Sequence, residues 1–341
     1  MHLFATGFNA WNQLSMEQKI LPDEPHDLFA FTKVLAATAI QRPVSRLTYT
    51  IVRQDGHLIV AGLAPEPQHL ELLYTSAEDA SGHILTIVQD QNTHDSNALV
   101  KRSSVSSPKP DAIFACTPPA TQIAAFSTGF VILHSNGTVS TFGDSRFEAC
   151  LGRDIDPPNR PSGTPGPVPD LHEIASADDP VKCVAAGGTA VAALTTSGSV
   201  YVWGSSSPSS TASKASGSSH HRHRRGHAFQ QLSGMPNYTE IGDGKDVVDV
   251  ALGESHAIAL TADGLVYVIG ENNNGQLGIG KATERAEEWI KVPFNAAEGS
   301  KIVGVAAGPR ASFILTAKTW TELIITDSHQ IEVKGIIEKP T

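Results

Sequence analysis

Residues 247–278, VVDVALGESHAIALTADGLVYVIGENNNGQLG, carry a pattern that returns several times along the chain. The same marks recur without a gap 66 residues earlier, where Gly187 and Gly204 stand in place of Gly253 and Gly270. Further copies lie 127 and 208 residues before the first one, and a truncated copy lies 55 residues after it. Repetition on this scale constrains the whole architecture, because each unit must bury its apolar surface against its neighbours.

The two ends of the chain complement each other within this repeat. The last copy, at residues 302–316, stops before the segment that follows the turn in the other copies. That segment stands at the other terminus, where Phe4–Leu14 superimposes without a gap on the region from Ile269 to Leu277. We therefore expect the two termini to share one blade and to close a ring, which removes the open sheet edge at the junction.

Each copy consists of short runs rich in Val, Ile, Leu and Ala on either side of a turn. In the best copy this turn is Asp263-Gly264, and Asp-Gly between apolar runs predicts a two-residue hairpin, since that turn needs positive φ. Each unit is therefore expected to be a small antiparallel sheet, and radial stacking of such sheets gives an all-β fold, the β-propeller. The residues assigned to this framework are Gly7, Gly62, Gly143, Gly204, Gly253, Asp263, Gly264, Gly270, Gly278 and Gly308.

The spacing G-x-x-H-x-x-A-L-x-x-D-G-x-V-Y-x-x-G-x-N-x-x-G-Q-L-G, from Gly253 to Gly278, resembles the regulator of chromosome condensation repeat. The resemblance implies a small propeller of six or seven blades, and seven is favoured because that number is usual in the family. Residues 69–101, with the strand-like runs LELLYT and HILTIV, are expected to form a further degenerate blade. Residues 15–45 are expected to complete the first blade, or residues 205–246 to contain another strand pair.

Composition narrows the class of protein. All 341 residues are expected to form one domain, because each blade of a propeller adds its own layer of core. The 35 Asp and Glu residues outnumber the 25 Lys and Arg residues, which argues against nucleic-acid binding by the whole surface. Three scattered cysteines without a C-x-x-C pair indicate reduced thiols. With no signal-peptide pattern and no apolar run of the ~18 residues that span a membrane, we expect a cytoplasmic or nuclear protein.

An insertion at about residues 205–227 interrupts the repeat after Gly204. It is rich in Ser and then becomes basic at the run HHRHRR, a composition that a disordered surface loop explains. The alternatives are a nuclear-import or nucleic-acid patch, a phosphorylated regulatory loop, or a metal-binding tract. For a zinc site, however, the histidines lack a second group of ligands at a fixed spacing. The candidate partner-binding residues in this insertion are Arg222, Arg224 and Arg225.

Two further loops are candidates for partner contacts. Residues 153–180 are rich in Pro, which predicts an extended, stiff segment that suits either partner contact or an ordinary connection between blades. Residues 279–300 contain a short helix-like stretch, TERAEEWIK, whose Trp is either anchored on the propeller or a binding hot spot. The candidate residues in these two loops are Arg153, Asp154, Asp156 and Trp289.

Several polar residues that suggest chemistry are better explained by the repeat. His256 corresponds to Ala190, Gly129 and Ala311 in other copies, so we favour a packing role over catalysis. Residues 242–245, GDGK, lack the spacing of a phosphate-binding loop and precede a strand. The amides of the repeated turn are expected to satisfy backbone groups instead of binding a ligand, and they are Asn9, Gln13, Asn272 and Gln276.

No triad order, metal cluster, carboxylate pair or cofactor motif stands out, so we expect no enzyme activity, no cofactor and no metal. The first hypothesis is a scaffold or regulatory subunit, monomeric on its own, that binds one or more proteins through its loop rims. The family resemblance also implies guanine-nucleotide exchange on a small Ras-like GTPase. It further implies an accessory role with a small protein in tRNA wobble-uridine or diphthamide modification, or partnership with a chromatin enzyme.

Overall fold

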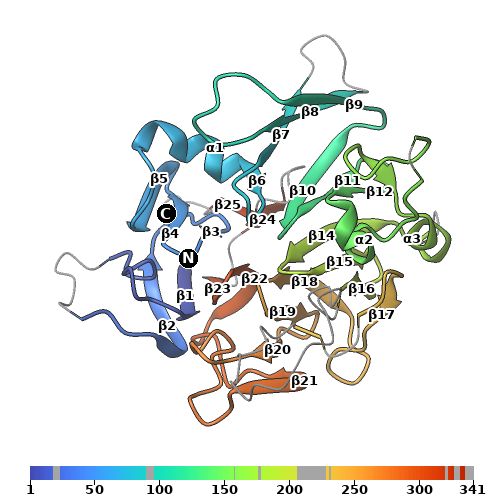
Figure 1. The fold of residues 1–341 in the computed structure, drawn as a ribbon. Coiled ribbons are helices and arrows are strands. Elements are labelled where there is room, and N and C mark those ends of the chain that lie inside the picture. Colours follow the sequence, from blue (N-terminus) through green and yellow to red (C-terminus); the bar gives the residue numbers. More distant parts are fainter. Residues whose placement is uncertain are drawn as a thin grey trace, which may run out of the picture.

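Six antiparallel sheets surround a central axis as the blades of a propeller (Figure 1). The structure is a computed structural model that describes residues 1–341, except for 18–23, 90–95, 157, 176–177, 206–227, 230–231, 319–321, 326–330 and 335–341. The predicted all-β propeller is confirmed. Within the described residues the number of blades is six, the lower of the two expected numbers and not the favoured seven.

The blades are numbered from the one that contains both termini, and their strands are given from the axis outward. The strands of blades 1 to 3 are β22 (Ser300–Gly308), β23 (Ala311–Lys318), β1 (His2–Gly7) and β2 (Leu28–Ala36); β3 (Val44–Ser45), β4 (Tyr49–Gln54) and β5 (His57–Gly62); and β6 (Ser76–Glu78), β7 (Ile84–Gln89), β8 (Asn97–Arg102) and β9 (Ala112–Cys116). Those of blades 4 to 6 are β10 (Ala120–Phe126), β11 (Gly129–His134), β12 (Val139–Gly143) and β13 (Gly166–Pro167); β14 (Val181–Gly187), β15 (Ala190–Thr195), β16 (Val200–Gly204) and β17 (Asn237–Tyr238); and β18 (Val247–Leu252), β19 (His256–Thr261), β20 (Val266–Glu271) and β21 (Arg285–Lys291).

The ring closes in blade 1 as the sequence predicts. Strand β1 pairs antiparallel with β23, in a register that runs from His2 opposite Thr316 to Gly7 opposite Ala311. Strand β2 then adds to the outer side of β1, so the segment 15–45 completes this blade through β2, while its last two residues already belong to β3 of blade 2. Residues 205–246 contribute only β17 among their described residues, and β17 joins blade 5.

One expected strand is a helix. The run LELLYT forms α1 (Leu70–Thr75), preceded by the 3-10 turn η1 (Pro67–His69), whereas HILTIV forms β7 as expected. The physical reason is the spacing of Leu70, Leu73 and Tyr74, which lie on one side of a helix and pack on the core of blade 2. No helix in the described part of the chain is long and apolar enough to cross a membrane.

The opposite error occurs at TERAEEWIK, which forms β21 and not a helix. Pairing with β20, which sets Ile290 opposite Val268 and Ala286 opposite Gly270, overrides the helix propensity of Ala and Glu. The Pro-rich segment 153–180 is also not extended throughout, because it contains β13 and the short helix α3 (Pro169–Ile174). The remaining short helical elements are η2 (Ser145–Phe147) and α2 (Glu148–Leu151).

The innermost strands are joined to one another by side chains at one repeated position. The inner strands of blades 4, 5, 6 and 1 each contain a register shift near their start, and Gln122 and Asp249 follow this shift. The Gln122 amide bonds both the N–H and the C=O of Val184 in the next blade, and Asp249 accepts from the N–H of Val305. These bonds connect sheets that share no ladder hydrogen bonds.

Neighbouring blades approach most closely where the inner strands end. A Cβ atom added at Gly187 would lie 2.3 Å from the carbonyl oxygen of Gly253, and one at Gly253 would lie 2.6 Å from that of Gly308. A Cβ at Gly308 would in turn lie 2.6 Å from Ser45. The repeated glycine at the end of the inner strand is therefore explained by close approach between blades.

We predict that the shared blade carries much of the stability of the ring. Leu3 of β1 is fully buried and packs with Phe313 and Leu315, so Leu3→Ala should lower the free energy of unfolding by about 2–5 kcal/mol. The measurement is chemical denaturation followed by circular dichroism. The matched control, Leu63→Ala, removes an exposed leucine and should change stability by less than about 0.5 kcal/mol. Equal effects of the two variants would contradict the prediction.

Candidate protein-binding site

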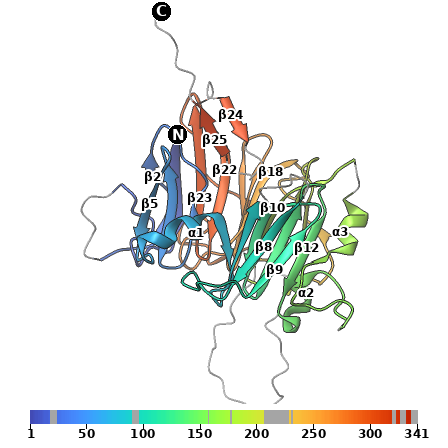
Figure 2. The same cartoon turned by 90° about the horizontal axis from the view of Figure 1, so that it is seen from above.

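The face that we call the turn face carries the six turns between the first and second strands of the blades. The third strands β1, β5, β12, β16 and β20 also end on this face, and long connections leave from it. Helix α2 lies on this side, whereas Met1 and the separate hairpin of β24 (Glu322–Ile325) and β25 (Ile331–Lys334) lie on the opposite side (Figure 2). The turn face therefore combines repeated turns with loops that differ between blades.

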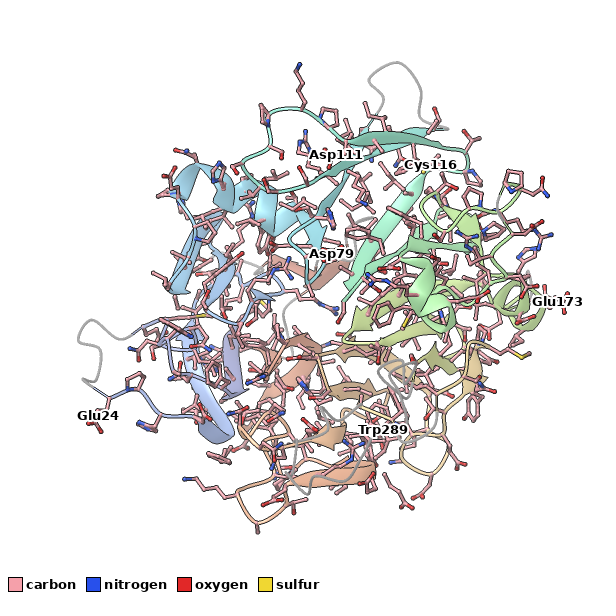
Figure 3. All side chains as sticks on the ribbon, in the orientation of Figure 1. Glu24, Asp79, Asp111, Cys116, Glu173 and Trp289 are labelled. Atoms are coloured by element: carbon pink, nitrogen blue, oxygen red, sulfur yellow. The ribbon has the colours of Figure 1, made fainter. Side chains whose placement is uncertain are left out.

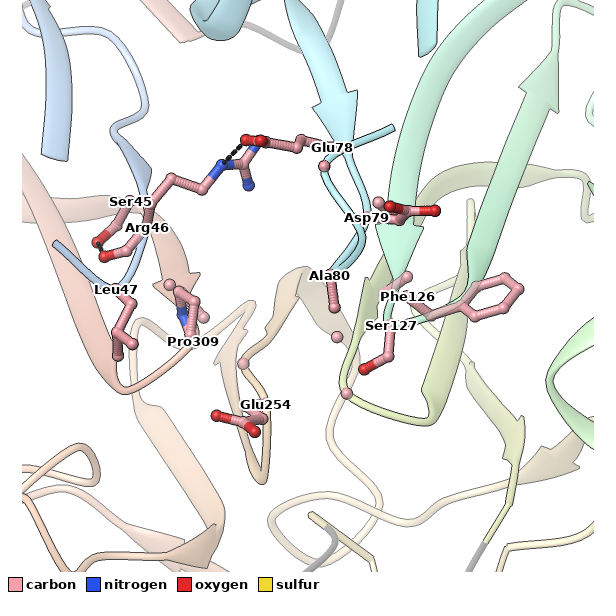
Figure 4. A pocket seen from close by; sticks show the side chains of 18 of the residues that line it. Ser45, Arg46, Leu47, Glu78, Asp79, Ala80, Phe126, Ser127, Glu254 and Pro309 are labelled. Carbon is pink, nitrogen blue, oxygen red and sulfur yellow. Dashed lines mark hydrogen bonds and ion pairs between the residues drawn. The ribbon is translucent and has the colours of Figure 1, made fainter. Parts of the chain in front are cut away.

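A pocket of about 660 Å³ opens where the six inner turns surround the axis (Figure 4). Every blade contributes to its wall, so the pocket exists only when the ring is closed. Backbone hydrogen bonds between turns of neighbouring blades hold the wall together, as between Ala80 and Ser127 and between Glu254 and Pro309. Representative lining residues, one from each of blades 1 to 6, are Pro309, Leu47, Asp79, Ser127, Gly188 and Glu254.

The charged side chains of the pocket have polar partners, and one ion pair, Arg46–Glu78, forms within the pocket itself. Arg46 donates to Glu78 across the boundary between blades 2 and 3, with 2.9 Å between Nε and Oε2. Asp79 is buried and accepts from the N–H groups of Ser81 and His83, which fixes its own turn. Such pairing gives a polar, shaped surface and no poised acid or base.

An apolar rim, defined as Trp11, Leu47 and Leu63, is centred on Leu47 of the pocket wall. These side chains are 48%, 43% and 62% exposed, and Leu47 also lines the pocket itself. Gln13 connects the two blades here, because its Oε1 accepts from the Trp11 N–H and its Nε2 donates to the Leu47 carbonyl. The Leu63 N–H donates to the carbonyl of Thr48, and this bond holds Leu63 close to the turn that contains Leu47.

The predicted residues Arg153, Asp154 and Asp156 lie in the connection between β12 and β13, away from the pocket. Arg153 is half-buried and donates to the carbonyls of Thr141, Pro161 and Thr164, so it supports the loop. Asp154 and Asp156 are exposed on this loop. The structure therefore does not bring these three residues together with the pocket, and their role in partner binding stays a prediction.

Trp289 lies on β21 at the outside of the ring, far from the axial Asp79 (Figure 3). Its indole Nε1 donates to Thr239 and its ring meets Phe229 edge-on, which anchors it between blades 5 and 6. Its expected alternative, a binding hot spot, stays a prediction. Arg222, Arg224 and Arg225 lie outside the described residues.

The amides of the repeated turn behave as the sequence predicts. Asn9 accepts from the N–H of Leu14, and Asn272 accepts from the N–H of Leu277, at the same spacing. Gln276 likewise accepts from the N–H two residues before it, as Gln13 does. Two matching turns therefore form at opposite ends of the sequence because the same side chains satisfy the same backbone groups.

His256 is fully buried between blades 6 and 1, where its Nε2 and the hydroxyl of Ser312 share a hydrogen bond of 2.9 Å. Burial lowers its pKa from 6.5 to about 4, so the ring is neutral near pH 7. The thiols of Cys150 and Cys183 are buried, which raises the pKa of each to about 11 and keeps them protonated. No cluster of three or more His, Cys, Asp and Glu residues suited to a metal ion occurs in the described ranges.

The sequence singled out only part of the pocket, because Gly253 and Gly308 of the repeat framework line it, whereas the rim did not stand out. Leu47 and Leu63 stand in turns and connections where the copies differ, and Trp11 and Glu254 occupy positions of the repeat that carry no repeated mark. A single apolar residue within an otherwise polar turn, such as Leu47 between Arg46 and Thr48, is a sequence signal that could have indicated this surface. Only the closed ring shows that these positions meet on one face.

The fold and this face define a β-propeller with a loop-lined axial pocket. The family model of the Regulator of chromosome condensation (RCC1) repeat matches residues 247–276, and a second model of the same repeat matches residues 263–315. Residues 247–315 therefore carry RCC1 repeats, as the motif predicted, within a chain that folds as a β-propeller.

Comparisons with known proteins agree with this assignment. The chain is 33% identical over 144 residues to the "Protein RCC2 homolog" of Danio rerio and 31% identical over 140 residues to that of Xenopus laevis. These matches cover 41% and 40% of this chain, but only 26% and 24% of the relatives. The chain thus matches about a quarter of the length of these relatives.

Solved structures support the fold. The Prp20p structure from Saccharomyces cerevisiae superimposes with a TM-score of 0.61 at 12% sequence identity, and covers 93% of this chain and 91% of Prp20p. Human WBSCR16 superimposes with a TM-score of 0.51 at 15% identity, and covers 94% of this chain and 99% of that one. At such low identity the similarity concerns the fold alone.

We predict that His256 makes the protein less stable in acid. The folded state holds this pKa near 4 while the unfolded state has the ordinary value of 6.5, so unfolding takes up a proton between these pH values. The free energy of unfolding should be unaffected by His256 above pH 6.5. It should fall by about 3 kcal/mol as the pH drops through 4, and this contribution levels off once the pH lies well below the folded-state pKa.

The measurement is urea denaturation at several pH values for the wild type and for His256→Gln. The difference between the two proteins isolates His256 from other groups, such as His134, whose pKa burial also lowers. The wild type should lose more stability than the variant between pH 7 and pH 4. Parallel pH profiles would show that His256 is not buried in its neutral form.

Proposed function

We propose that this protein is a non-enzymatic binding subunit whose protein partner docks on the turn face. The observation that carries the proposal is the axial pocket of about 660 Å³, whose wall contains turns from all six blades. A concave site on a closed ring of blades is suited to receive a protruding loop of a partner. The pocket offers no arrangement of nucleophile and base among its lining residues that would support catalysis.

The apolar rim supplies the second argument. Exposed Trp and Leu side chains beside a pocket are typical of interface anchors, because they bury a large apolar area when water is excluded. Leu47 and Leu63 belong to blade 2 and Trp11 follows β1 of blade 1, and backbone and Gln13 hydrogen bonds connect the three positions, so one partner surface can contact all three. The exposed Asp154 and Asp156 belong to a loop that leaves β12 on this face, and we propose them as peripheral contacts.

The comparisons favour a protein as the ligand. The structure of Prp20p is described together with its binding to Gsp1p and histones, and a second structure shows yeast RCC1 (Prp20) bound to Kap60. Those are partners of Prp20p, and they support the proposal only at the level of protein binding. The partner classes for this chain remain those that the family implies, namely a small GTPase, a small protein of tRNA or diphthamide modification, or a chromatin enzyme.

We expect the double variant Trp11→Ala/Leu47→Ala to weaken partner binding at least about tenfold, which corresponds to about 1.4 kcal/mol. The partner is first isolated with the tagged wild-type protein from its native cells, identified and produced in pure form. Affinity is then measured by isothermal titration calorimetry. The matched control, Val88→Ala/Ile113→Ala, removes two exposed apolar side chains of blade 3 and should leave the affinity unchanged. Equal losses in both variants would argue against docking at the rim.

Guanine-nucleotide exchange is the second candidate function, and the similarity in fold to a protein that binds Gsp1p favours it. An exchange factor acts by binding the nucleotide-free form of its GTPase more tightly than the nucleotide-bound form. It would therefore use the same kind of protein-binding face without catalytic side chains. The two proposed functions differ in one measurable property: an exchange factor accelerates nucleotide release from its GTPase, and a binding subunit does not.

We expect no acceleration of GDP release by this protein. Release of a fluorescent GDP analogue is followed across a panel of Ras-like GTPases, with and without a stoichiometric amount of the propeller. Acceleration of one GTPase by about tenfold or more, abolished in Trp11→Ala/Leu47→Ala, would replace the subunit proposal by exchange activity on the same face.

A further inference from the structure

Among the described residues, no fourth strand is paired to blade 2. Five blades contain four strands each, but the sheet of blade 2 consists of β3, β4 and β5 only, so β5 is its outermost strand (Figure 1). After β5 the chain enters η1 and α1 and continues directly into blade 3. In the other blades the segment after the third strand returns as a fourth strand. In blade 2 it forms a helix instead, so no strand pairs with the outer edge of β5 in the described structure.

The outer edge of β5 presents unpaired backbone groups. The Leu63 N–H donates to the Thr48 carbonyl, and this fixes which residues of β5 pair with β4. The N–H and C=O groups of Leu58, Val60 and Gly62 therefore point away from β4. Val60 is 43% exposed, whereas the equivalent third strands β12, β16 and β20 are mainly buried.

This edge also lacks the features that usually protect an edge strand. Proteins blunt such edges with Lys or other charges, Pro, bulges or very short strands. Residues 57–62, HLIVAG, contain no Lys, Arg, Asp, Glu or Pro, and β5 pairs with β4 without a register shift. By contrast, β2 contains Lys33, β21 contains four charged residues, and β13 and β17 have two residues each. The outer strand β9, AIFAC, also lacks charge and Pro, but it is the fourth strand of a complete blade, whereas β5 is the third strand of an incomplete one.

We propose that β5 receives an extended segment of a partner protein, which completes blade 2 as its fourth strand. Main-chain hydrogen bonds along an exposed edge give the affinity in this mode of recognition, and alternate side chains give the specificity. The strand ends at Gly62, directly before Leu63 of the apolar rim, so the added segment would continue onto the turn face. The inference deepens the proposed function, on which it rests for the existence of a protein partner.

Charge defines the chemistry of the segment. The exposed carboxylates near β5 are Asp55 before it and Glu66 and Glu71 after it, and Arg53 is the cation that pairs with Glu71. An extended segment with Lys or Arg between apolar residues complements this surface. A second copy of the chain does not, because antiparallel pairing of two β5 strands would set the Asp55 end of one against the Glu66 end of the other.

Synthetic peptides test the proposal with the full-length protein. The probe is a fluorescein-labelled eight-residue peptide of alternating Val and Lys, compared with alternating Val and Glu and with a Val-Lys peptide interrupted by a central Pro. We expect the basic peptide to bind at least about tenfold more tightly than the other two in fluorescence anisotropy. Hydrogen exchange should slow at the amides of Leu58, Val60 and Gly62 when it binds.

Two variants of the edge and one control locate the binding. Val60→Pro removes an outward N–H that β4 does not use, and Val60→Lys places a like charge on the edge, so both should weaken binding by about tenfold or more. Ile113→Lys, at an exposed position on the fourth strand β9, should leave binding unchanged. Circular dichroism and thermal unfolding establish whether each variant is folded. If Val60→Pro does not fold, Val60→Lys still tests the proposal.

Several outcomes would overturn the proposal. They are failure of every peptide to bind, equal binding of the Pro-interrupted peptide, binding that Val60→Lys does not weaken, or protection elsewhere in the chain. A concentration-dependent dimer that Val60→Lys abolishes would make a second copy the occupant. Trp11→Ala/Leu47→Ala should not affect peptide binding, so failure at the edge and failure of the turn-face proposal are separate results.

Discussion

The close approach of neighbouring blades at the ends of their inner strands is the constraint on which the rest of this structure depends. Sheets in a propeller share no ladder hydrogen bonds with one another, so their contacts must come from side chains and from the inner turns. Gly187, Gly253 and Gly308 lie where a Cβ would collide with the backbone of the next blade or with Ser45. Because the turns come this close, they form a continuous wall around the axis, and the pocket of the turn face is the space that this wall encloses.

The same ring explains why many of its polar side chains have a structural role. Repeated positions are occupied by residues that hold the blades together, as His256, Gln122 and Asp249 illustrate. Asp249 also pairs with Arg42 of the connection between blades 1 and 2, so one carboxylate of blade 6 contacts both blade 1 and the connection that follows it. The side chains left free to vary stand in turns and connections, where Trp11, Leu47 and Leu63 are exposed. A rigid frame with variable loops is the arrangement from which partner specificity arises.

The sequence predicted the framework far better than the site. Offsets between copies and the match of Phe4–Leu14 to the missing repeat end predicted both the hairpins and the closed ring, because these depend on local turn chemistry and on strand alternation. The run LELLYT was misassigned as a strand, since a short apolar run fits either element. The stretch TERAEEWIK was misassigned as a helix, because pairing with β20 outweighs the propensity of its residues. The preference for seven blades came from resemblance, and nothing in the residues themselves supported it over six.

The sequence by itself determined that this chain builds repeated antiparallel sheets, that Asp-Gly and Asn-Gly pairs turn them, and that its ends meet in one blade. These properties are encoded within each repeat, so they can be read one copy at a time. Only the tertiary structure decided that six blades close the circle, that β5 is left as an outer edge, and that Leu47 and Glu254 face one pocket. Those features depend on how much space each blade occupies around the axis and on contacts between residues distant in the sequence, which no single copy of the repeat contains.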